Sequence, residues 1–487
     1  MTPQALVIAA ILIPFAGAGL IVLTRWNRNL RETVTLVTAL ALAAVVYLIL
    51  GDVLDGRAPA TGAFEIAPGL ELALSVEPLG MLFACIAASL WIVNSIYSIG
   101  YMRGNNEPRQ TIFYVCFAIA IASTIGVAFS ANLLTLFLFY ELLTLSTYPL
   151  VTHRADEEAV EGGRTYLILL LGTSTVLFLP AIIGTALIAG TLDFTPGGIL
   201  AGKASGPVIA VLLALFMFGI GKAALMPFHR WLPAAMVAPT PVSALLHAVA
   251  VVKAGVFAVM KVVVYIFGID LLASSGESQW LVYVAAASLL IASVVALTKD
   301  NLKARLAYST VSQLAYVVLA AALANSLAVV GGSMHIAMHA VGKITLFFCA
   351  GAIYTAAHKT QVSELSGLGR AMPFTFAAFF VAALSIVGLP PLGGVWSKWY
   401  LALGALDAHQ FAMVAVLMVS SVLSLAYLLP IPLMAFFGKP ADNPGPRAIK
   451  EAPLPCLIAI GLTAIACVLL FFFPTPVLDL LERIDVR

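Results

Sequence analysis

Hydrophobic residues fill most of this chain in runs of 18–25 residues, and short stretches with charged residues, proline or glycine separate the runs. A bilayer core of about 30 Å is crossed by roughly 20 helical residues, so each run can form one membrane-spanning helix. The pattern predicts an all-α polytopic membrane protein with about fourteen transmembrane helices. We expect these helices near residues 5–24, 34–51, 78–100, 111–129, 132–152, 165–189, 208–226, 242–267, 280–297, 305–324, 332–356, 374–403, 411–437 and 453–474.

The basic residues between the helices support this count. Loops after even-numbered helices, together with the C-terminal end, contain Arg57, Lys203, Arg483 and Arg487. Loops after odd-numbered helices contain sixteen Lys and Arg, namely Arg25, Arg28, Arg31, Arg103, Arg109, Arg154, Arg164, Arg230, Lys299, Lys303, Arg305, Lys359, Arg370, Lys439, Arg447 and Lys450. Because cytoplasmic loops collect Lys and Arg, both termini are predicted on the outer side of a bacterial or archaeal-type inner membrane. The first run, without a basic region or a cleavage pattern, is predicted to be a retained helix.

Composition excludes several classes of function. Hydrophobic residues make up 62% of the chain and charged residues 10%, which leaves no segment for a soluble catalytic domain. The five cysteines lie in apolar runs without the spacing of a metal site or a disulfide framework. No glycine pattern follows a strand as phosphate or dinucleotide binding requires. The sequence therefore indicates no cofactor, and basic residues divided among membrane loops do not indicate nucleic acid.

Two predicted helices, the seventh and the twelfth, contain helix-breaking residues. The seventh reads GIGKAALMPFHRWLPAAM around Pro227, and the twelfth reads SIVGLPPLGGVWSKWY around Pro390 and Pro391. Proline removes a backbone donor and clashes with the preceding turn, so we expect each helix to break at membrane depth. Two kinked but continuous helices are the alternative, because proline and glycine are common in membrane helices.

The two interrupted helices are five positions apart and therefore have opposite orientations. This arrangement is typical of inverted-repeat transporters. It predicts helices 1–3 (residues 1–110), a first repeat of helices 4–8 (111–268), a second repeat of helices 9–13 (269–437) and a final helix 14 (438–487).

Six charged residues lie inside the apolar runs, and each costs about 2.5–3.5 kcal/mol or more at the centre of a bilayer. That cost favours a functional interpretation. Five are lysines and one is the only acidic residue at that depth: Lys222, Lys253, Lys261, Lys343, Lys398 and Glu141.

Glu141 is the only acidic candidate to pair with Lys222 in the membrane interior. Lys222 precedes Pro227 by five residues, and the carbonyl of Ala223, which Pro227 should free, is expected to attract the lysine ammonium. A partner cation would keep the carboxylate ionised. The alternatives are a static ion pair that joins two helices and, for Lys222, a side chain that extends towards the membrane surface.

The eighth helix contains His247, Lys253 and Lys261. Lys253 lies near the middle of the membrane, about 16 Å from the cytoplasmic start of its helix. Lys261 is nearer the outer end, so it is either a possible further member of a proton path or a lysine whose stem extends to the surface. His247 could take part in proton transfer or be a packed core histidine.

The eleventh helix reads HIAMHAVGK, which places His335, His339 and Lys343 at intervals of four residues on one face. Such a row suits proton transfer through intervening water, because histidine exchanges protons near neutral pH. A metal site would need further donors. Two packed histidines and a lysine that reaches the surface are the alternative.

Lys398 follows the break at Pro390 and Pro391, so the positive end of a helix dipole should point at it. Carbonyl groups are instead expected to face Lys222. The two interrupted helices would thus give their lysines opposite electrostatic surroundings. A surface-directed Lys398 is the alternative.

These motifs together resemble the antiporter-like subunits of respiratory complex I, membrane-bound hydrogenases and Mrp-type sodium/proton antiporters. The similarity rests on Glu141, on the segment around Lys222, on HIAMHAVGK and on GLPPLGGVWSK, and it covers nearly the whole chain. Chain length and Lys398 are similar to the MrpD subunit of Mrp antiporters, and the NuoN subunit of complex I fits almost as well. The resemblance implies fourteen helices with two inverted repeats and a hydrated axis of charged residues along the middle of the membrane.

The resemblance also implies a function and partners. We expect protons to move along Lys222, Lys253, the group of His335, His339 and Lys343, and Lys398, with Glu141 adjusting the proton affinity of Lys222. The expected partners are other membrane subunits, lipids, protons and Na⁺. A redox-driven complex that uses the same proton path is the second hypothesis, and a scaffold whose charges only join helices is the third.

Overall fold

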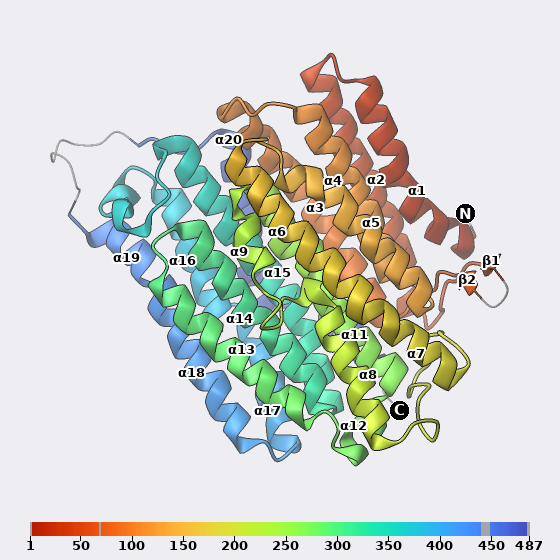
Figure 1. Cartoon of the computed structure of the whole chain (residues 1–487). Coiled ribbons are helices and arrows are strands. Elements are labelled where there is room, and N and C mark those ends of the chain that lie inside the picture. Colours follow the sequence, from red (N-terminus) through yellow and green to blue (C-terminus); the bar gives the residue numbers. More distant parts are fainter. Residues whose placement is uncertain (1, 68–69, 440–448, 485–487) are drawn as a thin grey trace.

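The protein is a bundle of membrane-length helices that run roughly side by side (Figure 1). The computed structural model describes residues 2–67, 70–439 and 449–484, so Arg447 and Arg487 lie outside the described residues. Within those ranges, twelve helical segments are long and apolar enough to cross a membrane. Two shorter apolar helices, Gly206–Gly219 and Pro373–Val387, occupy the two segments expected to be interrupted. The helical membrane fold is thus confirmed, while the full count of crossings and the inverted repeats stay predictions.

Most helices begin and end within a few residues of the predicted positions. Outside the interrupted twelfth helix, the largest differences are earlier starts at Arg28, Glu157 and Ser326 and an earlier end at Gly219. The α-helices are α1 (Pro3–Leu23), α2 (Arg28–Leu54), α3 (Pro78–Gly104), α4 (Gln110–Ala128), α5 (Leu133–Val151), α6 (Glu157–Thr173), α7 (Leu179–Ala189), α8 (Gly206–Gly219), α9 (Trp231–Ala234), α10 (Thr240–Ala244), α11 (Val251–Val262), α12 (Ile269–Ser275), α13 (Gln279–Thr298), α14 (Leu302–Leu323), α15 (Ser326–Ala357), α16 (Pro373–Val387), α17 (Gly394–Asp407), α18 (Phe411–Leu428), α19 (Pro430–Phe437), α20 (Leu454–Phe472) and α21 (Thr475–Leu481).

Short turns of other helical types join several of these helices. Three π-turns continue the membrane helices at Ser174–Phe178, Leu245–Val249 and Val263–Phe267. Tighter 3₁₀ turns lie at Gly221–Ala223, Ala235–Val237, Val362–Leu365 and Leu368–Arg370. The sequence pattern did not reveal the π-turns, because one inserted residue does not interrupt a uniformly apolar run.

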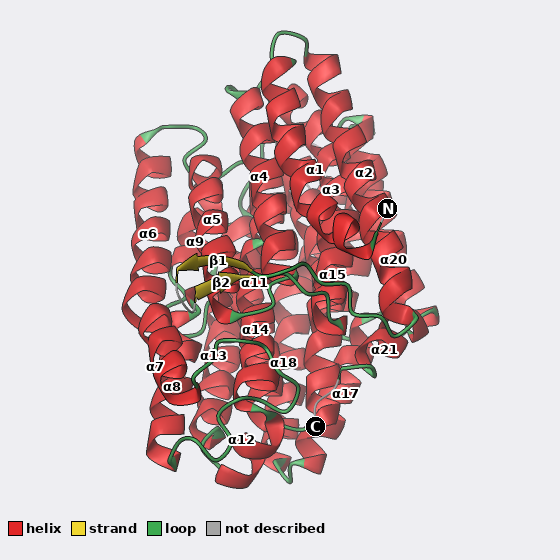
Figure 2. Ribbon diagram, turned by 90° about the vertical axis from the view of Figure 1, so that its right-hand side faces the viewer, coloured by secondary structure: helices red, strands yellow, loops and turns green. Residues whose placement is uncertain are grey.

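Along the chain, a small hairpin follows α2 and precedes α3, and Figure 2 shows its two strands in yellow. Strands β1 (Phe64–Ala67) and β2 (Leu70–Leu72) pair antiparallel, with Phe64 opposite Leu72. The purely helical prediction did not include it, because strands of four and three residues produce almost no detectable alternation.

Polar side chains fix the starts of the helices that carry the charged residues. Asn132, Asn301 and Asn325 accept hydrogen bonds from the third backbone N–H of α5, α14 and α15, at 2.8, 3.0 and 2.8 Å. Each amide oxygen thus satisfies a donor that has no partner within the helix. Similar caps hold α3 at Glu77 and α6 at Asp156.

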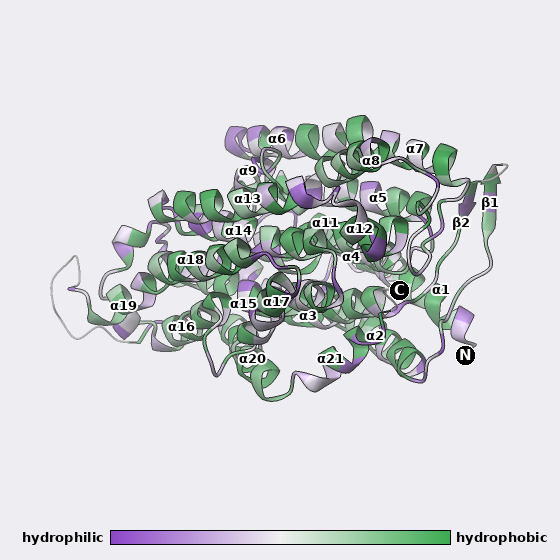
Figure 3. Ribbon diagram, turned by 90° about the horizontal axis from the view of Figure 1, so that it is seen from below, coloured by the Kyte–Doolittle hydropathy of each residue, from purple (hydrophilic) through white to green (hydrophobic). Residues whose placement is uncertain are grey.

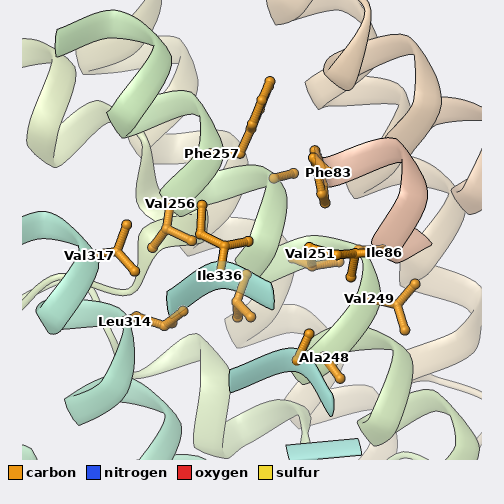
Figure 4. Packing of buried hydrophobic residues seen from close by; sticks show 14 of the residues in the cluster. Phe83, Ile86, Ala248, Val249, Val251, Val256, Phe257, Leu314, Val317 and Ile336 are labelled. Carbon is orange, nitrogen blue, oxygen red and sulfur yellow. The ribbon is translucent and has the colours of Figure 1, made fainter. Parts of the chain in front are cut away.

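The core of the bundle is formed by three segments rich in titratable residues. The apolar part of Thr240–Phe267 is buried at every position, and that of α14 and α15 at nearly every position. In α20, by contrast, fewer than a third of these positions are buried. Figure 4 shows buried side chains of this centre, with Phe257 of α11 next to Phe83 of α3, 4.9 Å between the ring centres. Charged residues on these segments are therefore surrounded by protein and not by lipid.

Loops with most of the basic residues contact one another at one end of the bundle, which we call the basic face. Arg154 pairs with Glu107 at 3.1 Å, and Arg103 pairs with Glu32. The Ser363 hydroxyl donates to Asp300 at 2.7 Å. Figure 3, coloured by hydropathy, shows hydrophilic positions at helix ends and as a few patches within an otherwise apolar bundle.

Candidate functional site

The first interrupted segment places Lys222 outside any α-helix. Helix α8 ends at Gly219, and α9 begins only at Trp231. The predicted break at Pro227 is thus confirmed, but it begins well before the proline. Lys222 lies in the 3₁₀ turn Gly221–Ala223, and its freed backbone N–H donates to the Tyr140 hydroxyl at 3.0 Å. Side chains of neighbouring helices therefore replace the lost helical hydrogen bonds, as membrane depth requires.

The Lys222 ammonium reaches helix α5 and not its own break. It donates to the Tyr140 carbonyl at 2.8 Å and to the Thr144 hydroxyl at 2.5 Å, and it lies 3.2 Å from the centre of the Tyr140 ring. The expected contact with the carbonyl of Ala223 is wrong, because the turn directs the side chain away from the break.

Glu141 does not contact Lys222 in this conformation. Both carboxylate oxygens are buried and have no hydrogen-bond or ion-pair partner among the described residues. The prediction of a direct ion pair between Glu141 and Lys222 is therefore wrong. The cause is helical geometry: Glu141 points about 100° away from Tyr140 around α5, so Thr144, one turn further on, faces the lysine instead.

Helix α11 packs directly against the break that carries Lys222. A Cβ atom at Gly255 would clash with the Ala223 nitrogen and with the Lys222 carbonyl carbon. Only a glycine permits this approach. Lys253 lies two residues earlier on α11, about 200° around the helix from Gly255, so its side chain contacts α15 and not the break.

Lys253 and the histidine row of α15 form a continuous group. The Lys253 ammonium lies 2.6 Å from His339 Nδ1. The rings of His339 and His335 stack with centroids 5.8 Å apart, and His335 Nδ1 lies 2.9 Å from the Ser397 hydroxyl of α17. Helices α11, α15 and α17 are thus joined through side chains at mid-membrane.

Lys398 lies next to the end of this group. Its ammonium is 4.9 Å from the centre of the Tyr316 ring, which itself stacks on His335 at 5.2 Å. It donates to the Val387 carbonyl at 2.9 Å and to Ser421 at 3.0 Å. The sequence did not predict this contact: Val387 ends α16, so the negative end of that helix dipole lies at the ammonium, although Lys398 is also the fifth residue of α17.

Helix α14 supplies polar partners that sequence reasoning missed. Ser309 accepts from the Lys343 ammonium at 2.7 Å, and the Thr310 hydroxyl lies 2.9 Å from His247 Nδ1. Tyr316, two turns further along, lies between His335 and Lys398. The repeat of these side chains on one face of α14 was the available signal, but serine, threonine and tyrosine are common in apolar helices.

Lys261 is separated from this group. It is fully buried, forms an ion pair with Glu77 at 2.8 Å and donates to the Ser130 carbonyl at 2.7 Å. The expectation that its stem reaches the surface is wrong, because Glu77 caps α3 and supplies the opposite charge inside the protein.

Several buried polar atoms near the relay have no partner among the described residues. Gln313 of α14, a residue that the sequence pattern did not reveal as a candidate, lacks partners for both amide atoms. Buried polar groups without a protein partner are normally satisfied by water. The others in this part of the bundle are His247 Nε2, Ser333 Oγ, His335 Nε2, His339 Nε2 and Ser420 Oγ.

We define the relay as Lys222, Lys253, His335, His339, Lys343 and Lys398, with Glu141 beside its first member. Its groups hold exchangeable protons, and hydroxyl, imidazole or ring contacts connect most of them. No set of three or more His, Cys, Asp or Glu side chains in the described part of the chain is arranged to hold a metal ion. The arrangement is suited to proton transfer.

Residues 130–424 match the family model described as NADH:quinone oxidoreductase/Mrp antiporter, TM. NADH-quinone oxidoreductase subunit N of Desulforudis audaxviator is 34% identical over 392 residues, which cover 79% of this chain and 76% of that protein. A Na⁺/H⁺ antiporter subunit of Alkalihalophilus pseudofirmus is 29% identical over 96% of this chain, which spans 60% of that longer relative.

The fold is also similar to a solved structure. A chain in the Mrp complex from Dietzia sp. superposes with a TM-score of 0.88 at 23% identity, over 100% of this chain and 97% of that one. The family match covers more than half of the chain, and the relatives are subunits of multisubunit membrane complexes. This chain therefore belongs to the NADH:quinone oxidoreductase/Mrp antiporter family.

Proposed function

We propose that this chain is a proton-translocating subunit of a multisubunit Mrp-type Na⁺/H⁺ antiporter, with a place in the complex like that of MrpD. Protons move along the relay, whose two ends are Lys222 and Lys398, parallel to the membrane plane. Other membrane subunits take part in the coupling to Na⁺, and lipids surround the outer helices.

The observation that carries the proposal is the connected group at the centre of the bundle. The Lys253 ammonium contacts His339, and the rings of His339 and His335 stack. The ring of Tyr316 lies between His335 and Lys398 and contacts both. Each neighbour can accept a proton that the previous group releases, either directly or through the water that the partnerless polar atoms require.

Glu141 has a different part in this proposal. It has no partner of its own among the described residues, and a carboxylate charge that approaches Lys222 stabilises the lysine ammonium. A change in the distance between the two side chains would alter the affinity of Lys222 for a proton and so start or stop transfer to Lys253.

A second candidate is the same proton relay in a redox-driven complex. The 34% identity to a subunit N of NADH-quinone oxidoreductase favours it. The two candidates share the relay and differ in the partners. Purification of the native complex separates them: an Mrp complex contains only membrane subunits, whereas a redox complex also contains iron–sulfur and flavin proteins.

Transport by the assembled complex in sealed vesicles tests the relay itself. We expect Glu141→Gln and Lys222→Ala to reduce proton movement by more than about tenfold, the effect of about 1.4 kcal/mol on a barrier. Lys203→Ala, which changes an exposed lysine in the loop before α8, is the matched control and should transport like the parent. Normal transport by both relay variants in a fully assembled complex would show that the buried charges only join helices.

A further inference from the structure

A cavity of about 200 Å³ opens at the basic face, and none of the residues that line it belongs to the relay. Its rim contains the exposed side chains Arg154, Glu158 and Lys359. Its floor contains Tyr101 and Thr240, which are almost fully buried. The cavity thus leads from charged surface residues into the core between α3, α10, α14 and α15.

A row of polar residues continues from the floor towards the relay. Thr240, Ser243 and His247 lie at intervals of three and four residues, so they share one face of the segment that starts with α10. The Ser243 hydroxyl and His247 Nε2 are buried and have no partner among the described residues. Asn94 Oδ1 is also partnerless there, and the Asn94 amide donates to the Pro241 carbonyl beside this row, at 3.2 Å.

A second row on α14 leads to the same histidine. Lys303 lines the cavity and donates to the Ala238 carbonyl at 2.5 Å. Thr310, seven residues or about 10 Å further along α14, lies 2.9 Å from His247 Nδ1. The neighbouring Ser309 accepts from Lys343. Both rows therefore end at His247, and the α14 row continues to Lys343 of the relay.

We propose that this cavity is the site at which protons from the basic face are taken up, and that Lys303 and His247 carry them to Lys343 and Lys253. A proton that Lys303 receives from cavity water is passed, through water held by Ser243 and Thr310, to His247, and Lys303 returns to its neutral form. His247 then releases the proton to the relay. This inference rests on the proposed function, and it assigns roles to Lys303, Thr240 and Ser243 that the relay does not include.

Filling the cavity tests its role without altering a charge. Val237→Trp places an indole among the lining residues and should lower proton transport by the assembled complex by more than about tenfold. Ile168→Trp, in a second open cavity beside Arg230 and Tyr308, is the matched control and should transport like the parent. Lys303→Gln, which keeps a polar side chain but no exchangeable charge, should reduce transport as Val237→Trp does.

Thiol labelling gives an independent readout. Thr240→Cys should react with a small water-soluble methanethiosulfonate added at the basic face at least about tenfold faster than Thr463→Cys, an equally buried threonine on α20. The modification should also stop transport.

The outcomes separate the two proposals. If Thr240→Cys reacts no faster than Thr463→Cys, and Val237→Trp and Lys303→Gln transport normally while Lys222→Ala does not, the uptake site is refuted and the proposed function stands. If Lys222→Ala and Glu141→Gln also transport normally, the proposed function itself is refuted.

Discussion

Lys253 and His339 share a contact of 2.6 Å between α11 and α15, in a core where no acidic group pairs with either side chain in the described residues. Two adjacent buried cations would repel each other, so we expect at most one of the two side chains to be positively charged at a time. His339→Gln keeps an acceptor for Lys253 but cannot take up a proton. We expect transport by the assembled complex to fall by more than about tenfold.

The exposed histidine His409 provides the control for this change, because it lies in the loop between α17 and α18. His409→Gln should leave transport unchanged. Equal transport by His339→Gln and the parent would show that the lysine passes its proton by another route.

Thr144 holds the Lys222 ammonium through a hydrogen bond of 2.5 Å. Thr144→Val keeps the shape of the side chain and removes this acceptor. A hydrogen bond to a charged group contributes about 1.5–3 kcal/mol, so transport should change by roughly ten- to a hundredfold. Thr147→Val, one turn away, removes a bond to the Tyr166 hydroxyl but not to the lysine, and it should preserve transport. The same loss in both variants would indicate damage to α5 and not to the relay.

Gly255 allows α11 to touch the break that contains Lys222. Gly255→Ala forces the two backbones apart and should lower the free energy of unfolding by about 1–3 kcal/mol. The thermal unfolding midpoint of the purified complex in detergent measures this loss. Gly172→Ala in α6 has open space around the new methyl group and should be neutral or slightly stabilising. An unchanged midpoint for Gly255→Ala would mean that this contact is not tight.

The ion pair of Lys261 and Glu77 should support the fold and not the relay. Loss of one partner from a buried pair costs about 3–5 kcal/mol, and Glu77→Gln should be near the low end because Glu77 is 20% exposed. The double variant with Lys261→Met should recover stability, and Lys261→Met alone should still transport. Loss of transport at an unchanged unfolding midpoint would place Lys261 in the relay.

The long helices, the proline breaks and the energetically unfavourable buried lysines of this protein could be predicted from its sequence. Apolar runs long enough for a bilayer gave the helices, and Pro227 with Pro390 and Pro391 gave the two interruptions. Lysines in apolar surroundings are so unfavourable that they indicated the relay without any contact being known.

The partners of these lysines could not be predicted in the same way. Thr144, Ser309 and Gln313 cost little in an apolar helix, so nothing in the sequence distinguishes them from other polar residues there. The prediction that Glu141 pairs directly with Lys222 was wrong for a related reason. Opposite charge predicts attraction but not which face of α5 the lysine meets.

The π-turns at Leu245–Val249 and Val263–Phe267 enclose the twelve residues of α11. Each π-turn adds one residue to a helical turn and so rotates everything after it by about 100° compared with a regular α-helix. The deletion of a single apolar residue between 245 and 249 would restore regular winding and change no charged or polar side chain, yet it would swing Lys253 away from His339. The contact between Lys253 and His339 therefore depends on the rotation of α11 about its own axis as much as on the two residues themselves.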